Sequence, residues 1–134
     1  MLSITRIMVG LCYLQHGMQK HFQFPPTRTP SPDFLSLIWF AGTVEVVCGT
    51  LLVLGLFARP AAFIAAGEVA CAFWIAHWPR SFYPVVNSGT LVVVYCFTFL
   101  YFVFAGPGPI SLDQLIFGRR DKDNVTPSLA SQAE

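Results

Sequence analysis

Charged residues are scarce in this chain of 134 residues. Asp, Glu, Lys and Arg together make up 11% of it, against 54% hydrophobic residues, and the mean hydropathy is +0.59. Soluble domains carry about 25% charged residues, so this composition excludes that class and predicts an integral membrane protein. The net charge of +1 comes from scattered basic residues, which gives no reason to expect a nucleic-acid partner.

Paired cysteines are missing as well. The four cysteines lie one in each apolar segment, with no CxxC spacing, so we expect no disulfide framework. We interpret them as small apolar side chains packed between helices. A four-thiolate metal site is the alternative, but no polar side chains nearby would support such ligands, so we expect no metal. The cysteines are Cys12, Cys48, Cys71 and Cys96.

Four apolar segments are present, each near the length that crosses a bilayer as a helix. The predicted fold class is all-α: an integral membrane four-helix transmembrane bundle over residues 1–117, followed by a polar cytoplasmic tail, 118–134, that we expect to be disordered. Ser31 and Pro32 would begin the second helix, after an external proline-rich loop. The helices are expected at about 2–21, 33–57, 60–78 and 86–105, with a short interfacial helix at about 111–117 capped by Ser111 and Gln114.

Basic residues predict the orientation of these spans. Four spans put both termini on one side of the membrane, and basic residues are more frequent on that side, which favours termini in the cytoplasm. Arg6, Arg59, Arg119, Arg120 and Lys122 lie on the side of the termini, and Lys20, Arg28 and Arg80 on the other.

A polar stripe ends the first segment. Such a stripe is costly against lipid, so we expect it to face other helices, with Glu45 of the second segment as its partner. Gly42 and Gly49 would let a neighbouring backbone come close beside Glu45. We predict that His16, Gln19, Lys20 and Glu45 form one enclosed polar cluster. The stripe comprises Tyr13, His16, Gln19 and Lys20 and is continued by Arg6, Gly10 and Gly17.

The third segment carries a second intramembrane carboxylate, Glu68. We interpret Glu68 as a hydrogen-bonded acid that holds two helices together, and Arg6 as a further structural polar residue. The alanines at four-residue spacing in this segment predict a packed inner helix. The fourth segment is mostly β-branched and aromatic, and we assign no ligand site to it.

Several short motifs resemble the DoxX family of small prokaryotic membrane proteins, in the same order and over about residues 4–113. The resemblance implies a four-helix bundle in the cytoplasmic (inner) membrane, associated with respiratory or redox chemistry. One departure is Thr90, which stands where the family commonly has a glutamate. The motifs are Arg6 with Gly10, Leu14-Gln15-His16-Gly17-Met18-Gln19-Lys20, Glu45 with Gly49, Gly55-Leu56-Phe57-Ala58-Arg59, His77 with Pro79, Asn87-Ser88-Gly89, and Gly106-Pro107-Gly108 with Ser111-Leu112-Asp113.

Three functions remain open. The first is a redox subunit that binds a quinone between helices one and two; without a haem, flavin or metal motif, it would be an accessory subunit of a quinone-linked oxidoreductase. The second is a non-catalytic membrane anchor or assembly subunit of a larger complex or homo-oligomer. The third is a small-molecule carrier, although the chain has no internal repeat. The candidate ligand-binding residues are Tyr13, His16, Gln19, Lys20, Glu45, His77 and Asn87.

Overall fold

The fold is known from a computed structural model that describes residues 1–26 and 30–116. The tail expected over 118–134 lies outside the described residues. All regular secondary structure within them is helical, so the all-α class is confirmed. The elements are α1 (Leu2–Phe22), α2 (Leu37–Leu54), α3 (Ala58–Ala72), the π-helical turn η1 (Phe73–His77), α4 (Thr90–Ala105) and α5 (Leu112–Ile116).

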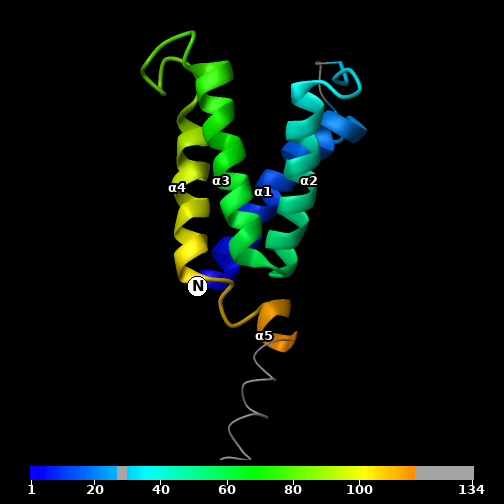
Figure 1. Cartoon of the computed structure of the whole chain (residues 1–134), viewed down its shortest axis with the longest axis vertical. Coiled ribbons are helices and arrows are strands. Elements are labelled where there is room, and N and C mark those ends of the chain that lie inside the picture. The colour runs from blue at the N-terminus through cyan, green and yellow to red at the C-terminus, as the bar shows by residue number, and fades with distance from the viewer. Residues whose placement is uncertain (27–29, 117–134) are drawn as a thin grey trace, which may run out of the picture.

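The helices form two antiparallel hairpins, α1–α2 and α3–α4. Figure 1 shows that the hairpins meet at the end that holds the N-terminus, the α2–α3 turn and α5, and diverge toward the end that holds the other two loops. We call these the closed end and the open end.

Two helices begin later than their segments predicted. α2 starts at Leu37 and not near residue 33, because the hydroxyl of Ser36, and not of Ser31, accepts the backbone N–H of Trp39 at 3.2 Å. α4 starts at Thr90 and not near residue 86, because the preceding residues form turns, in which the N–H groups of Val86 and Asn87 bond to the carbonyl of Tyr83. Both helices are therefore shorter than their apolar segments.

Glycine brings α1 and α2 into backbone contact. A methyl group on Gly17 would lie 2.7 Å from the carbonyl oxygen of Gly42 and 2.7 Å from the nitrogen of Val46. A methyl group on Gly49 would lie 2.9 Å from Cα of Leu14. The close approach predicted beside Glu45 is therefore present, and it places the polar end of α1 directly against the middle of α2.

Small residues on α3 face large ones on α1 and α4. The buried alanines of α3 include Ala62 and Ala66, which confirms the prediction of a packed inner helix. Against them lie Tyr13, Phe99 and Phe102, each at most 1% exposed. Small side chains on one helix leave space for large ones on the next, so the helices pack closely toward the closed end, where the hairpins meet.

Polar bonds fasten the closed end. The Arg6 guanidinium, 1% exposed, donates to the carbonyls of Pro107 and Ile110 in the segment before α5. The Asp113 carboxylate of α5 accepts the backbone N–H groups of Phe57 and Ala58 at 2.8 and 3.0 Å. The hydroxyl of Ser111 accepts the N–H of Gln114, as their spacing predicted. These bonds tie α5 to α1 and to the α2–α3 turn.

Candidate functional site

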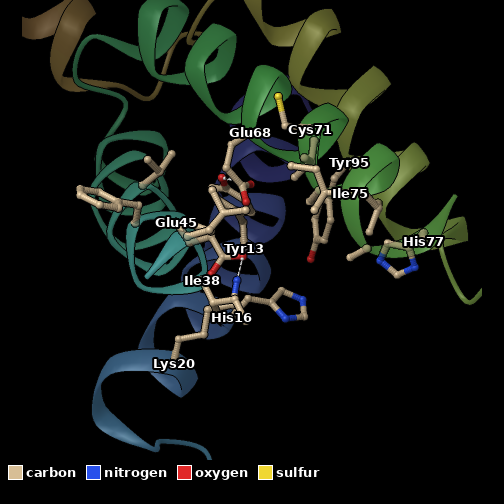
Figure 2. Close-up of a pocket in the computed structure, with 18 of the residues that line it drawn as sticks. Tyr13, His16, Lys20, Ile38, Glu45, Glu68, Cys71, Ile75, His77 and Tyr95 are labelled. Carbon is tan, nitrogen blue, oxygen red and sulfur yellow. Dashed lines mark hydrogen bonds and ion pairs between the residues drawn. The ribbon is translucent and has the colours of Figure 1, made fainter. Parts of the chain in front are cut away.

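A cavity of about 620 Å³ lies between the hairpins, with walls from α1, α2, α3, η1 and α4. Its walls are mainly aliphatic and aromatic. Ile38 and Phe40 of α2 and Ile75 of η1 line it and are exposed, so they form an apolar rim. The size and lining are those of a small-molecule pocket. Figure 2 shows the polar side chains within it; the polar lining residues are Tyr13, His16, Lys20, Glu45, Glu68, His77, Ser88 and Tyr95.

Lys20 and Glu45 form an ion pair in the cavity wall, with 2.7 Å between Nζ and Oε1. Glu45 is 6% exposed, and its Oε2 is buried without a hydrogen-bond partner among the described residues. Lys20 is more accessible, since it lies in the last turn of α1 at the open end. A buried carboxylate oxygen without a donor is costly, so the bond from Lys20 to Oε1 is the main polar support of Glu45 among the described residues.

Tyr13 joins α1 to α3 on the same wall. Its hydroxyl donates to Oε2 of Glu68 at 2.9 Å, and its ring packs edge-on against Tyr95 and Phe99, with centroids 5.9 and 4.8 Å away. The bond links two helices, as we expected of Glu68. It also brings Glu68 into the cavity wall, which the sequence pattern did not predict. Two carboxylates, Glu45 and Glu68, therefore border one cavity.

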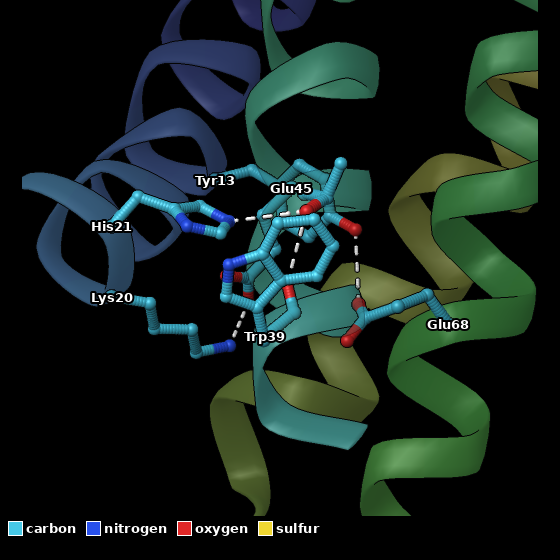
Figure 3. Close-up of polar contacts among 7 residues, drawn as sticks. Tyr13, Lys20, His21, Trp39, Glu45 and Glu68 are labelled. Atoms are coloured by element: carbon cyan, nitrogen blue, oxygen red, sulfur yellow. Dashed lines mark hydrogen bonds and ion pairs between the residues drawn. The ribbon is translucent and has the colours of Figure 1, made fainter. Parts of the chain in front are cut away.

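A second polar link between α1 and α2 lies beside the ion pair. Figure 3 shows the imidazole of His21 reaching toward α2, where its Nε2 lies 3.2 Å from the hydroxyl of Thr43. The ring of His21 also packs edge-on against Trp39, with centroids 5.3 Å apart. These contacts hold the last turn of α1, which also carries Lys20, against α2.

His16 and Tyr95 complete the polar lining. The ring of His16 meets the edge of Tyr95 with centroids 6.1 Å apart, and Tyr95 itself is buried. Tyr95 was missed in the sequence, because the fourth segment looked like uniform apolar filling. The one available signal was a phenolic hydroxyl at the centre of an otherwise apolar segment, since buried tyrosine hydroxyls usually have a partner.

His77 and Asn87 occupy different positions relative to the cavity. His77 lines it, and its Nδ1 lies 3.0 Å from the carbonyl oxygen of Asn87. The Asn87 side chain is buried in the loop before α4, where it donates to the carbonyl of Ser81 and accepts the N–H of Gly89. Asn87 therefore shapes the loop that holds His77. It is not among the cavity-lining residues that the structure describes.

Gln19 does not join the predicted cluster. At about 100° per residue, six positions place it about 120° from Tyr13 around α1, whereas Lys20 lies only about 20° away. The Gln19 amide points to the proline-rich loop, 3.5 Å from the carbonyl of Pro25, and lines a separate hollow with Gln23. The cluster is thus His16, Lys20 and Glu45, joined by Tyr13 and Glu68.

The remaining singled-out residues lie elsewhere. Arg6 is at the closed end, away from the cavity, and Thr90 is exposed at the first turn of α4 and does not line the cavity in the described structure. Packing between helices was the wrong interpretation for two cysteines. Cys12 and Cys71 are exposed, and Cys71 lines the cavity, whereas Cys48 is buried.

Among the residues that the structure describes, two helices are long and apolar enough to cross a membrane by length and composition. They are Leu37–Leu54, with 18 residues, and the continuous helix Ala58–His77, with 20 residues. Thr90–Ala105 is apolar but shorter. Many apolar side chains on these helices are exposed, among them Phe63, Ile64 and Phe97. Lipid chains would cover this apolar surface favourably, whereas contact with water would be unfavourable.

Comparison with known proteins gives one family match and two close relatives. The family model described as DoxX matches residues 1–78. An uncharacterized protein of Haemophilus influenzae is 38% identical over 121 residues, which cover 87% of this chain and 90% of the relative. An uncharacterized membrane protein of Mycobacterium tuberculosis is 30% identical over 131 residues, which cover 85% of this chain and 80% of the relative. No solved structure matches the chain significantly.

Proposed function

The chain belongs to the DoxX family, and from this premise we propose that it is a membrane subunit of a respiratory or redox complex that binds a quinone in the cavity between its two hairpins. Its family and its relatives make it a prokaryotic membrane protein in contact with the lipid bilayer. The proposal adds that α1 to α4 all cross the inner membrane and that both termini are cytoplasmic. The single observation that carries the proposal is an apolar cavity with ionisable groups in its wall.

The apolar part of the cavity suits a ligand that arrives from the bilayer. A quinone is a flat ring on an isoprenoid tail, and it partitions into the membrane. Exposed Ile38, Phe40 and Ile75 at the rim would lie against lipid, so the tail could remain in contact with the bilayer while the ring enters. Because the tail can stay among the lipid chains, the protein needs no enclosed channel to hold it.

The polar part suits a ring that carries two oxygen atoms and exchanges protons. Lys20, His16 and the hydroxyl of Tyr95 are donor types from which a quinone oxygen could accept. Glu45 or His16 would carry the proton when the ring changes its redox state. Electrons would come from a partner protein that holds a redox centre, so this chain acts as an accessory subunit. Ionisable side chains inside a membrane domain are expensive and mark functional sites.

Binding can be tested by filling the cavity. Ala41 lines the cavity on α2, whereas Val47 on the same helix is exposed and lies outside the cavity-lining set of the described residues. We expect the purified wild-type protein to bind a short-chain benzoquinone in calorimetric titrations, Ala41→Phe to bind it at least about tenfold more weakly, and Val47→Phe to bind it like the wild type.

The same titrations can contradict the proposal. Wild-type protein that binds no quinone, or Ala41→Phe that binds as well as the wild type, would remove the ligand site. If such a protein nevertheless purifies in a stoichiometric complex with other subunits, the function is that of a membrane anchor. The polar cluster would then serve only to hold α1, α2 and α3 together, for which the Lys20–Glu45 and Tyr13–Glu68 bonds are sufficient.

A further inference from the structure

We propose that two copies of this chain pair in the membrane through the outward face of α1, with the Gln15 side chains of the two copies hydrogen-bonded to each other. The outward face consists of Ile4, Met8, Leu11 and Gln15, which are all exposed. The pairing rests on the proposed placement of α1 across the bilayer, and it does not depend on a ligand in the cavity. An amide without a partner, among apolar side chains, carries it.

Gln15 faces away from the bundle. Tyr13 packs in the core and Gly17 packs on α2, and each is two positions from Gln15, or about 200° around α1. The Gln15 side chain is exposed, and its amide has no hydrogen bond to any residue that the structure describes. An amide has two N–H donors and an acceptor oxygen, so three hydrogen-bonding positions lack a protein partner here.

Gln15 also lies deep in the proposed span. It is seven residues, or about 10 Å, from Phe22 at the open end of α1. Its neighbour Gly17 touches the backbone of Val46, which is halfway along α2, and Gln15 is farther still from the open end. A long lysine or arginine side chain can extend to the headgroups from inside the bilayer, whereas the glutamine side chain is shorter. The amide is therefore surrounded by hydrocarbon, where an unpaired polar group is costly.

Two threonines show how other exposed polar groups in these helices are satisfied. The hydroxyl of Thr50 donates to the carbonyl of Val46, and that of Thr98 to the carbonyl of Val94, both at 2.7 Å. Each threonine thus bonds to its own helix one turn back and needs no external partner. Gln15 has no such bond, so its partner must come from outside the chain.

The residues around Gln15 form a face suited to a second helix. Ile4, Met8, Leu11 and Gln15 follow one another at intervals of four, three and four residues, the spacing of a seam between two helices that pack in a left-handed coiled coil. The three apolar side chains are 55%, 56% and 38% exposed. A single polar residue in such a seam fixes the register and the number of helices.

A second copy of the chain is the occupant that this face fits. Copies of one chain enter the membrane in the same orientation, so a twofold axis along the membrane normal makes the two α1 helices parallel. The same axis brings Gln15 opposite Gln15 at equal depth. Each amide can then donate an N–H group to the oxygen of the other, which satisfies both.

Cysteine crosslinking tests the geometry on the full-length chain, with the four native cysteines changed to alanine and the protein reconstituted in phospholipid vesicles. A disulfide needs Cα atoms within about 7 Å, so it forms only where two copies meet closely. We expect Met8→Cys and Leu11→Cys to give disulfide-linked dimers under mild oxidation. Val47→Cys and Phe63→Cys are the controls, at exposed positions of α2 and α3, and should stay monomeric.

A dilution series tests the role of Gln15. Chains with Ser128→Cys in the same cysteine-free background carry a donor or an acceptor dye, and Förster transfer is measured as lipid is added. Gln15→Leu should weaken pairing by about three- to twentyfold, the range expected for hydrogen bonds between membrane helices. Gln15→Asn, which keeps the amide, should restore most of it. Thr98→Val is the matched loss of an exposed polar group and should pair like the wild type.

Several outcomes would overturn the pairing. They are the absence of dimers at positions 8 and 11, equal crosslinking at positions 47 and 63, and Gln15→Leu chains that pair as tightly as the wild type. Crosslinks from positions 8 and 11 to a different protein in cell membranes, with a purified chain that stays monomeric, would assign the face to that protein instead. Quinone titration is a separate measurement, so a monomer that binds quinone overturns the pairing alone and leaves the proposed function standing.

Discussion

At Gly17 the distance between two helices depends on a single missing methyl group. Its Cβ position is 2.7 Å from two backbone atoms of α2, the carbonyl oxygen of Gly42 and the nitrogen of Val46. Backbone atoms cannot turn aside as a flexible side chain can. Any larger residue at position 17 must therefore push α1 away from α2 and separate Lys20 from Glu45.

We expect Gly17→Ala to lower the free energy of unfolding by about 1–3 kcal/mol, the usual cost of overpacking a well-filled interface. Gly67→Ala is the matched control on α3, where an added methyl group meets nothing within 4 Å. It should be neutral or stabilising by about 0.5–1 kcal/mol, the helix preference of Ala over Gly. Unfolding curves in the same detergent measure both variants. Equal stability of the two would show that α1 and α2 do not meet at Gly17.

Residue periodicity predicted part of the site. It paired Lys20 with Glu45, because opposite charges inside a membrane are stabilised by pairing. Both residues also lie on helix faces whose small residues indicate close contact between helices. It was wrong for Gln19, because a residue six positions after Tyr13 lies on a different face of α1. It did not find Tyr95, because the contribution of one hydroxyl in an apolar helix depends on which helices surround it, and that is a property of the tertiary fold.

At the scale of elements, Asp113 fastens α5 to the α2–α3 turn. Asp113 accepts two backbone N–H groups at the start of α3, and its own N–H donates to the carbonyl of Gly55. A helix of five residues has little stability of its own, so these bonds decide whether α5 stays docked. Asp113 also caps α3, whose first N–H groups would otherwise lack acceptors.

Asp113→Ala should cost about 1 kcal/mol, the usual value of a lost helix cap. The sharper readout is hydrogen exchange, because the amides of Phe57 and Ala58 lose their acceptor and should exchange about fivefold or more faster. Gln114→Ala is the control at the neighbouring exposed position, where we expect no change. Unchanged exchange at both amides in Asp113→Ala would contradict the docking of α5 by this carboxylate.

The sequence predicted the number and order of the helices better than their ends. Hydropathy marks where apolar residues are, and it cannot tell the last helical turn from an apolar loop such as the one before Thr90. The π-helical turn η1 was not expected, because its residues simply continue the apolar segment of α3. It arises where Trp78 bonds to the carbonyl of Phe73, and it lies at the cavity, as π-turns often do at functional sites.

At the scale of the whole molecule, the cavity exists because the two hairpins are fastened at one end and part at the other (Figure 1). No local pattern predicts that divergence. It follows from polar bonds at the closed end, such as those of Arg6, together with the small residues of α3 near the same level. The sequence could predict the four helices, but the space between the hairpins depends on how all of them pack.

The proposed orientation can be tested with single cysteines in a background where the four native cysteines are alanine. We expect cysteines at positions 31 and 88 to react with a membrane-impermeant maleimide in intact cells, because both follow outward ends of spans. A cysteine at position 128 should react only after the cells are permeabilised. Labelling of positions 31 and 128 from the same side would contradict four spans with cytoplasmic termini.

Photolabelling tests the proposed quinone site most directly. A short-chain quinone with a photoreactive azide on its ring is irradiated with the purified full-length protein, and the modified residues are identified by mass spectrometry. We predict labels on cavity-lining residues such as Ala41, Val44 and Ala72, and loss of these labels when unmodified ring compound is in excess. Labels confined to the exposed lipid-facing residues Phe97 and Phe104, with no competition, would contradict a binding site between the hairpins.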